Sequence, residues 1–92
     1  MVRIIARVKS QYGIHARPSA VIATAAKDDF PKTEILLFKV NSEESAQARS
    51  VLEIMCLALS CGTCVIVQAV GEDENKAAEA IVNIIETFEI ES

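Results

Sequence analysis

Hydrophobic and polar residues alternate along residues 2–9, and this pattern predicts a β-strand with one face against a core. Residues 33–40 and 64–70 are rich in aliphatic and β-branched residues and predict two further strands. A polar turn over residues 41–44 is followed by a short return strand at residues 45–48. The chain therefore offers four strands, two of them joined as a hairpin.

Helical patterns separate the strands. The first predicted helix runs from Ala16 to Lys27, and Phe30 marks its exit because the residue before a proline avoids helical angles. The second begins after Ser50, which forms a capping-box pattern with Glu53, and continues until the stop at residues 60–62. A helix this short depends on packing for its stability.

The third helical pattern follows Gly71 and places acidic residues 72–74 in its first turn, where the helix dipole favours negative charge. Apolar residues recur along it at helical spacing, namely Ala77, Ile81, Ile84 and Phe88. The order β-α-β-β-α-β-α predicts an α+β fold with helices on one face of an antiparallel sheet. We expect residues 1–92 to form a single domain.

The composition limits the classes of function. The chain has 13 acidic and 9 basic residues and a net charge of -4, which argues against a nucleic-acid partner. No apolar run approaches the ~20 residues of a membrane span, and residues 1–9 have the pattern of a strand, not of a signal peptide. We expect a cytoplasmic protein with no membrane insertion and no enclosed cofactor cavity.

The chain has three cysteines, an odd number that does not fit a fully paired disulfide framework. Cys61 and Cys64 form a C-x-x-C in a predicted turn that leads into a strand, whereas redox motifs of this kind open a helix. A metal site would need a second pair of ligands. The pattern favours a packing role for these two residues and Cys56, buried or half-buried, over redox or metal chemistry.

The only histidine, His15, lies between a glycine and a proline at a predicted helix start. Gly13 permits a tight bend, Pro18 prefers the first turn of a helix, and Arg17 adds a fixed positive charge. Free N–H groups and the positive end of the dipole suit an anion there, phosphate above all. A lone histidine is more often a surface or capping residue, but neither role needs these neighbours. We interpret the stretch as a site that handles a phosphoryl group reversibly.

The residues Gly13-Ile14-His15-Ala16-Arg17-Pro18 closely resemble the phosphorylation signature of HPr, the histidine-containing phosphocarrier family of the bacterial sugar phosphotransferase system. Residues 49–55 resemble the regulatory-serine segment of that family, and residues 71–74 resemble its usual entry to the last helix. The likeness covers nearly the whole chain.

The resemblance implies an open-faced β-sandwich, with four antiparallel strands in the order 1-4-2-3 and three helices on one side. It implies a monomeric, stoichiometric carrier, not an enzyme, without cofactor or metal. His15 would accept a phosphoryl group on Nδ1 from phosphorylated enzyme I and pass it to the A domain of a sugar-specific enzyme II. Phosphoenolpyruvate would be the ultimate donor.

The physical chemistry of the helix start agrees with these implied roles. A neutral imidazole nitrogen is a nucleophile, and the phosphorylated ring carries roughly two negative charges at pH 7. The N–H groups of Ala16 and Arg17 and the Arg17 guanidinium would meet those charges. Pro18 has no N–H, so we expect it to fix the helix start. Each contact must stay modest, because a carrier has to hand its phosphate on.

Two further surfaces follow from the resemblance. Docking to partners would use apolar side chains near His15, namely Ala20, Val51, Leu52 and Met55. A plain core role for Leu52 and Met55 is an equal alternative. Ser50 would be the target of a serine kinase, although a serine N-cap with Glu53 three residues later is a sufficient explanation for it. Glu53 and the cysteines depart from the family pattern.

A second class of function stays open. A regulatory binding protein could keep this fold and control a transcription factor or an enzyme. The intact His15 favours the carrier, because a purely regulatory relative could lose its histidine without harm. A small-molecule-binding regulatory domain of related topology is a third interpretation, but it does not explain why His15 and Arg17 lie at a helix start.

Overall fold

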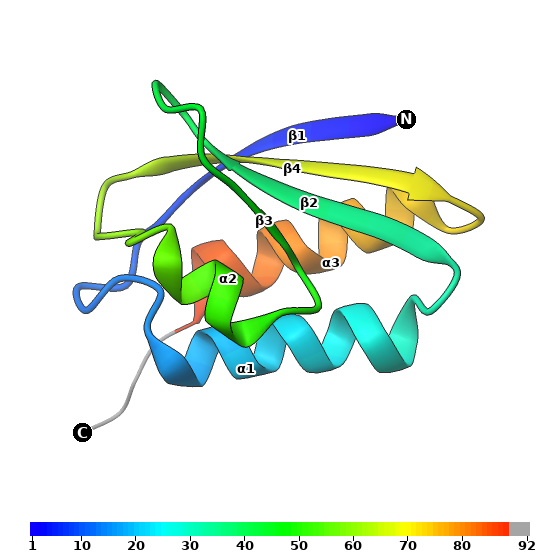
Figure 1. The fold of residues 1–92 in the computed structure, drawn as a ribbon, viewed down its shortest axis with the longest axis horizontal. Coiled ribbons are helices and arrows are strands. Elements are labelled where there is room, and N and C mark those ends of the chain that lie inside the picture. The colour runs from blue at the N-terminus through cyan, green and yellow to red at the C-terminus, as the bar shows by residue number, and fades with distance from the viewer. Residues whose placement is uncertain (89–92) are drawn as a thin grey trace.

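The structure, a computed structural model, describes residues 1–88 and places four strands in one sheet with the helices against one of its faces (Figure 1). The elements in chain order are β1 (Val2–Arg7), α1 (Ala16–Thr24), the π-helical turn η1 (Ala25–Asp29), β2 (Thr33–Lys39), β3 (Ser45–Gln47), α2 (Val51–Cys56), β4 (Cys64–Gly71) and α3 (Glu74–Thr87). All paired strands are antiparallel, in the order β1-β4-β2-β3. The predicted α+β architecture and strand order are confirmed.

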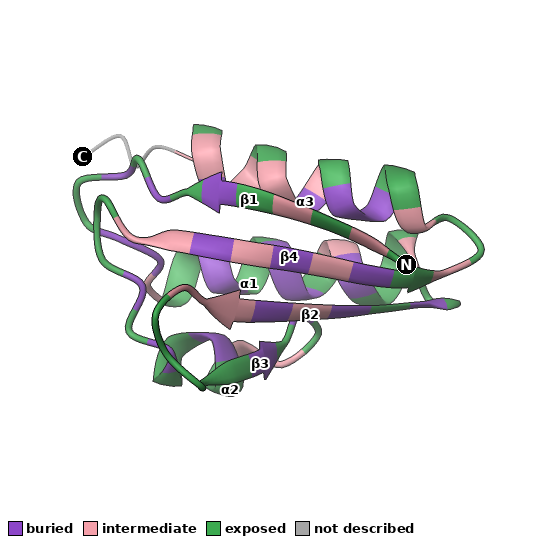
Figure 2. Ribbon diagram, turned by 90° about the horizontal axis from the view of Figure 1, so that it is seen from above, coloured by how far each residue is buried: buried purple, intermediate pink, exposed green. Residues whose placement is uncertain are grey.

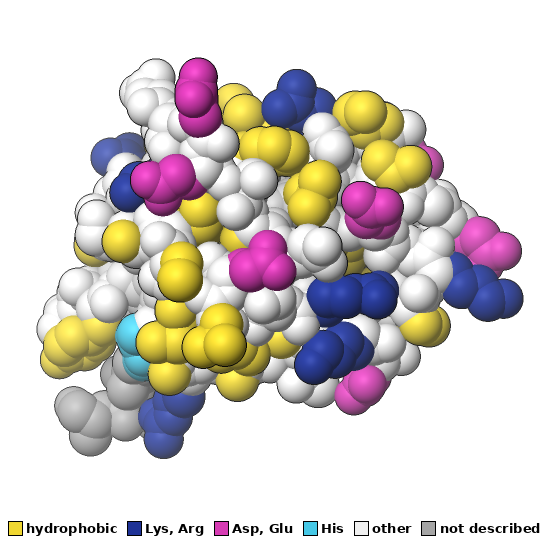
Figure 3. All heavy atoms as spheres, viewed as in Figure 1, with side chains coloured by type: hydrophobic (Ala, Val, Ile, Leu, Met, Phe, Trp, Pro, Cys, Tyr) yellow, Lys and Arg dark blue, Asp and Glu magenta, His cyan; other side chains and the backbone are white. Residues whose placement is uncertain are grey.

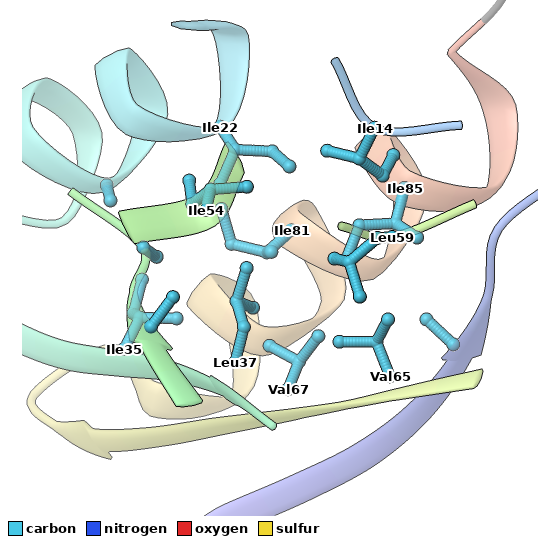
Figure 4. Packing of buried hydrophobic residues seen from close by; sticks show 14 of the residues in the cluster. Ile14, Ile22, Ile35, Leu37, Ile54, Leu59, Val65, Val67, Ile81 and Ile85 are labelled. Carbon is cyan, nitrogen blue, oxygen red and sulfur yellow. The ribbon is translucent and has the colours of Figure 1, made fainter. Parts of the chain in front are cut away.

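Alternation along the strands decides which side chains form the core. Figure 2 shows buried residues alternating with less buried ones along β4, whose Val65, Val67 and Ala69 point toward the helices. Figure 4 shows Val65 and Val67 of β4 in the same cluster as Ile22 of α1 and Ile81 of α3. The sheet supplies one wall of the core and the helices supply the other, while the opposite face of the sheet stays uncovered. No helix in the described part of the chain is long and apolar enough to cross a membrane.

The second helix ends earlier than its sequence pattern predicts. α2 stops at Cys56, and Ala58 takes a left-handed conformation with φ of 51° instead of continuing to residue 59. Leu57 and Leu59 on either side of it are both buried. The chain reverses at Ala58 because this turn buries both leucines, which a continued helix would place on different faces.

The ends of the other helices differ less. α1 begins at Ala16 as predicted, but it ends at Thr24 and continues as η1, so the helical path reaches two residues beyond the predicted end. The buried stripe of α3 consists of Ala77, Ala78, Ile81 and Ile85. Half-buried Ile84 also packs against the core, so the predicted stripe was wrong only at Phe88, which lies after the last residue of α3.

Candidate functional site

A tight turn at Gly13 delivers the chain to the start of α1. The Gly13 N–H donates to the Ser10 carbonyl at 2.9 Å, and the Ile14 N–H donates to the Leu59 carbonyl at 2.7 Å. Gly13 has φ of 71°, and a Cβ at this position would lie 2.5 Å from the Leu59 oxygen. Only glycine fits, both because of the backbone conformation and because of the close approach of the loop after α2.

His15 is the N-cap residue of α1, but its side chain does not cap the helix. Its backbone is extended, with φ of −97° and ψ of −159°, and its carbonyl accepts the Ser19 N–H at 3.0 Å as the first helical hydrogen bond. The imidazole makes no hydrogen bond to the N–H groups of the first turn. The interpretation of His15 as a simple capping residue is therefore wrong.

The two ring nitrogens of His15 differ in accessibility. The ring is half-buried, and Nε2 is fully buried with no hydrogen-bond partner among the described residues. A group arriving from solvent or from a partner protein cannot reach Nε2 without displacing the residues that cover it. The burial of Nε2 favours Nδ1 as the reactive nitrogen.

The first turn of α1 is prepared for an anion. The N–H groups of Ala16 and Arg17 have no hydrogen-bond partner within residues 1–88, and the first turn of α1 carries no acidic residue. The Arg17 side chain is exposed and makes no ion pair in the described part of the chain. Pro18 is buried at the third helical position, where its missing N–H leaves no bond unmade. The sequence-predicted residues His15, Ala16, Arg17 and Pro18 thus come together at one helix end.

An open hollow of about 350 Å³ lies beside His15. Its mostly apolar walls come from three chain segments, with Tyr12 before the histidine, Met55 on α2, and Ala58 and Leu59 in the turn after α2. Figure 3 shows the histidine, in cyan, bordering a group of hydrophobic side chains. Sequence reasoning missed Tyr12, although an aromatic residue next to the flexible Gly13 and three positions before the histidine was a usable signal.

Three of the four candidate docking residues are exposed, and one of these, Met55, also lines this hollow. Leu52 and Met55 are exposed by 77% and 42%, so their alternative role as plain core residues is wrong. Ala20 is exposed on α1, and Val51 is half-buried at the start of α2. α1 and α2 pack against each other, so Ala20 and the docking residues of α2 lie on neighbouring helices, and Met55 lines the same hollow as His15. Apolar side chains that remain in solvent beside a reactive group are typical of a surface that binds another protein.

Ser50 caps α2 as predicted, but the reciprocal half of the capping box is absent. Its hydroxyl oxygen accepts the Glu53 N–H at 3.2 Å. The Glu53 carboxylate turns instead to β3 and accepts the Gln47 N–H at 3.1 Å, while the Ser50 N–H donates to the Gln47 carbonyl. Glu53 therefore ties α2 to the hairpin, and its charge lies at the β3 side of the docking residues.

The exposure of Cys56 and Cys61 contradicts the packing role predicted for the cysteines, whereas half-buried Cys64 agrees with it. Cys56 and Cys61 are exposed and Cys64 is half-buried, and all three are free thiols. Cys61 lies in the turn that leads into β4, where Cys64 is the first residue. The predicted location of the C-x-x-C is confirmed, and its predicted burial was wrong for two of the three residues.

Comparisons with known proteins agree with this geometry. Residues 2–87 match the family model described as the PTS HPr component phosphorylation site. The chain is 38% identical to the phosphocarrier protein HPr of Haemophilus influenzae over 77 residues, which is 84% of this chain and 86% of that protein. It resembles the crystal structure of HPr-C-His from Thermoanaerobacter tengcongensis, with a TM-score of 0.81, 34% identity and coverage of 92% and 91%. It also resembles Crh, the catabolite repression containing protein of Bacillus subtilis, with a TM-score of 0.68, 33% identity and coverage of 92% and 93%.

Proposed function

We propose, since the chain belongs to the HPr family of phosphocarrier proteins, that His15 is the residue that carries the phosphoryl group. The single observation that supports this assignment most is the position of the His15 ring at the N-terminus of α1, with Nε2 buried and two N–H groups unpaired among the described residues. Such an end binds a charged phosphoryl group through N–H donors and the helix dipole.

The proposed transfer step is a direct displacement. The lone pair of His15 Nδ1 attacks phosphorus, the new N–P bond forms, and the bond between phosphorus and the donor protein breaks with its electron pair left on the donor atom. The N–H groups of Ala16 and Arg17 and the Arg17 guanidinium stabilise the charge on the phosphoryl oxygens. The reverse of the same step delivers the group to the next protein, so the chain is a carrier that returns to its starting state.

The partners proposed for this carrier dock on the exposed apolar residues around His15. Phosphorylated enzyme I would supply the phosphoryl group, and the A domain of a sugar-specific enzyme II would receive it. Both would cover Leu52 and Met55, because Met55 lines the hollow beside His15 and Leu52 is exposed one helical turn before Met55 on α2.

The proposal is tested with enzyme I, magnesium and phosphoenolpyruvate. The protein should gain an acid-labile phosphate on His15, and the variant His15→Ala should gain none. Absence of label on the wild-type protein, in the presence of its own active enzyme I, would contradict the carrier function. Label retained by the His15→Ala variant would contradict the assignment of the residue.

A second candidate function is regulation through Ser50. The likeness to Crh, whose name refers to catabolite repression, favours a role in binding and controlling a transcriptional regulator. Ser50 is half-buried at the N-cap of α2, between the docking residues and β3. Incubation with an HPr serine kinase and ATP should label the wild-type protein and not Ser50→Ala. Equal labelling of the two proteins would leave Ser50 with its capping role alone.

A further inference from the structure

Two buried polar atoms at the start of α1 lack a hydrogen-bond partner among the described residues, namely Nε2 of His15 and Oγ of Ser19. Ser19 is 0% exposed. Buried polar groups nearly always have a partner, either in the protein or in an ordered water molecule, because an unpaired one costs the free energy of its lost hydration. Because both atoms are buried, each requires a hydrogen-bond partner.

The helix geometry directs Ser19 toward His15. The Ser19 N–H donates to the His15 carbonyl at 3.0 Å, so Ser19 lies one helical turn after the histidine. Side chains of a helix lean toward its N-terminus and over the residue four positions earlier. The Ser19 hydroxyl is therefore directed back to the end of α1 that holds the imidazole.

The surroundings of Ser19 offer no competing side chain. The other buried residues of α1, which are Pro18, Ile22 and Ala23, have no polar side-chain atom. The buried residues of the neighbouring helices are apolar as well, namely Ile54 of α2 and Ala77, Ala78, Ile81 and Ile85 of α3. Among the described residues, Nε2 of His15 is the only other buried side-chain N or O atom that lacks a hydrogen-bond partner, so it is the group that matches the Ser19 hydroxyl.

We propose that Ser19 is a positioning residue for His15, and that its Oγ accepts a hydrogen bond from Nε2–H through one bridging buried water molecule, since the two atoms are not in direct hydrogen-bond contact. In a neutral imidazole one nitrogen carries the proton and the other carries the lone pair, and the hydrogen bond made by one nitrogen decides the arrangement. A proton held at Nε2 leaves the lone pair on Nδ1. Ser19 would thus select the tautomer that can attack phosphorus.

The same hydrogen bond acts after transfer, in a role that rests on the carrier function proposed above. When Nδ1 bonds to phosphorus, the Nε2 proton stays in place and the ring gains a positive charge. The N-terminus of α1 disfavours that charge, whereas an oxygen acceptor at Nε2–H stabilises it. The hydrogen bond to Ser19 therefore offsets part of the destabilisation that the N-terminus of α1 imposes on the positively charged ring.

Nitrogen-15 NMR of the unphosphorylated protein tests the hydrogen bond without any partner protein. His15 is the only histidine in the chain, so its ring signals are unambiguous. At a pH where the ring is neutral, the wild type should show a protonated Nε2 and an unprotonated Nδ1. In Ser19→Ala both signals should move toward a mixture of tautomers. Ser10→Ala, which removes the hydroxyl of another buried serine residue, should leave the ring signals unchanged.

Two results would overturn the proposal. Ring signals that are the same in Ser19→Ala and the wild type, together with a higher melting temperature of the variant, would show that the hydroxyl is buried without a partner, since its removal then only relieves a cost. An unprotonated Nε2 in the wild type would overturn it even if the variant did not fold. Neither result depends on phosphoryl transfer, so the carrier function would stand.

Discussion

Arg17 combines an exposed guanidinium, no ion pair among the described residues, and a place in the first turn of α1 next to His15. A side chain with these properties contributes little to the fold and is free to meet a phosphoryl group. The chemistry of the site can therefore be separated from its stability by substitution at this one position.

We predict that Arg17→Ala slows phosphoryl transfer and leaves the melting temperature unchanged. Loss of a hydrogen bond to a charged group, about 1.5–3 kcal/mol, corresponds to a slowing of roughly tenfold to a hundredfold. Rapid-quench measurement of transfer from phosphorylated enzyme I checks this. Arg17→Lys keeps the positive charge but cannot form two parallel hydrogen bonds, so its transfer rate should lie between those of the wild type and Arg17→Ala. Wild-type kinetics in Arg17→Ala would show that the guanidinium has no part in transfer.

The residues of the phosphoryl site could be predicted from the sequence to different extents. His15, Arg17 and Pro18 are readable because bend, charge and helix start follow one another within six positions. Ser19 was not readable as a positioning residue, because its burial depends on α2 and α3, which are far away in the sequence. The exposure of Leu52 and Met55 could not be predicted for the same reason, since the sequence of a short apolar helix does not show which of its faces is buried.

Among the elements, the loop before α1 and the turn after α2 act as one support for the site. They are joined by the Ile14 N–H to Leu59 carbonyl bond, and Gly13 lies directly against that carbonyl. Any side chain at position 13 would push the two segments apart. The position of His15 then depends on a residue that never touches the phosphoryl group.

We predict that Gly13→Ala destabilises the protein by more than Gly62→Ala. Both glycines have positive φ, of 71° and 89°, so each variant pays a similar backbone strain of about 1–3 kcal/mol. A Cβ at Gly62 meets nothing within 4 Å, whereas one at Gly13 meets the Leu59 oxygen at 2.5 Å. Urea denaturation measures the difference in unfolding free energy, and Gly13→Ala should also slow transfer. Equal losses in the two variants would argue against the close contact.

The docking role of α2 can be tested against the uncovered face of the sheet. Leu52 is exposed by 77% on α2, and Ile5 is exposed by 65% on β1. We predict that Leu52→Ala weakens binding to enzyme I, whereas Ile5→Ala leaves it unchanged. Both variants should keep the wild-type melting temperature, since neither side chain is packed. Calorimetric titration with enzyme I gives the two dissociation constants, and equal weakening in both would contradict a docking surface centred on α2.

Element boundaries show where a sequence pattern stops being informative. Local residues predicted both β1 and β4, the first through its alternation of apolar and polar residues and the second through its aliphatic and β-branched residues. The early end of α2 depends on Ala58, a residue with no intrinsic preference for the left-handed conformation. The burial of Leu57 and Leu59 imposes the left-handed conformation on Ala58, and no residue within the segment predicts that conformation.

At the scale of the whole molecule, the N-terminus is tied to the last helix. The ammonium group of Met1 forms an ion pair with Glu74 Oε2 at 2.7 Å, and the Gly71 N–H donates to Glu74 Oε1 at 3.4 Å. The ammonium group, followed by the Gly71 N–H, lowers the pKa of the Glu74 carboxyl from its ordinary value. The contact joins the start of β1 to the start of α3.

This pair makes stability depend on pH in a defined direction. Because the pKa of Glu74 is lower in the folded state, ionised Glu74 stabilises the fold at pH above the unfolded glutamate pKa of about 4.3. That contribution is lost as the pH falls through the lowered pKa. We predict that Glu74→Gln melts at a lower temperature than the wild type at pH 7, and that the gap narrows as the pH falls below about 4. Glu79→Gln, on an exposed position of the same helix, should show no such gap. Thermal melts of the three proteins from pH 7 to pH 3, with Met1 retained, measure it. A gap that stays constant over this range would mean that Glu74 acts through helix packing and not through its charge.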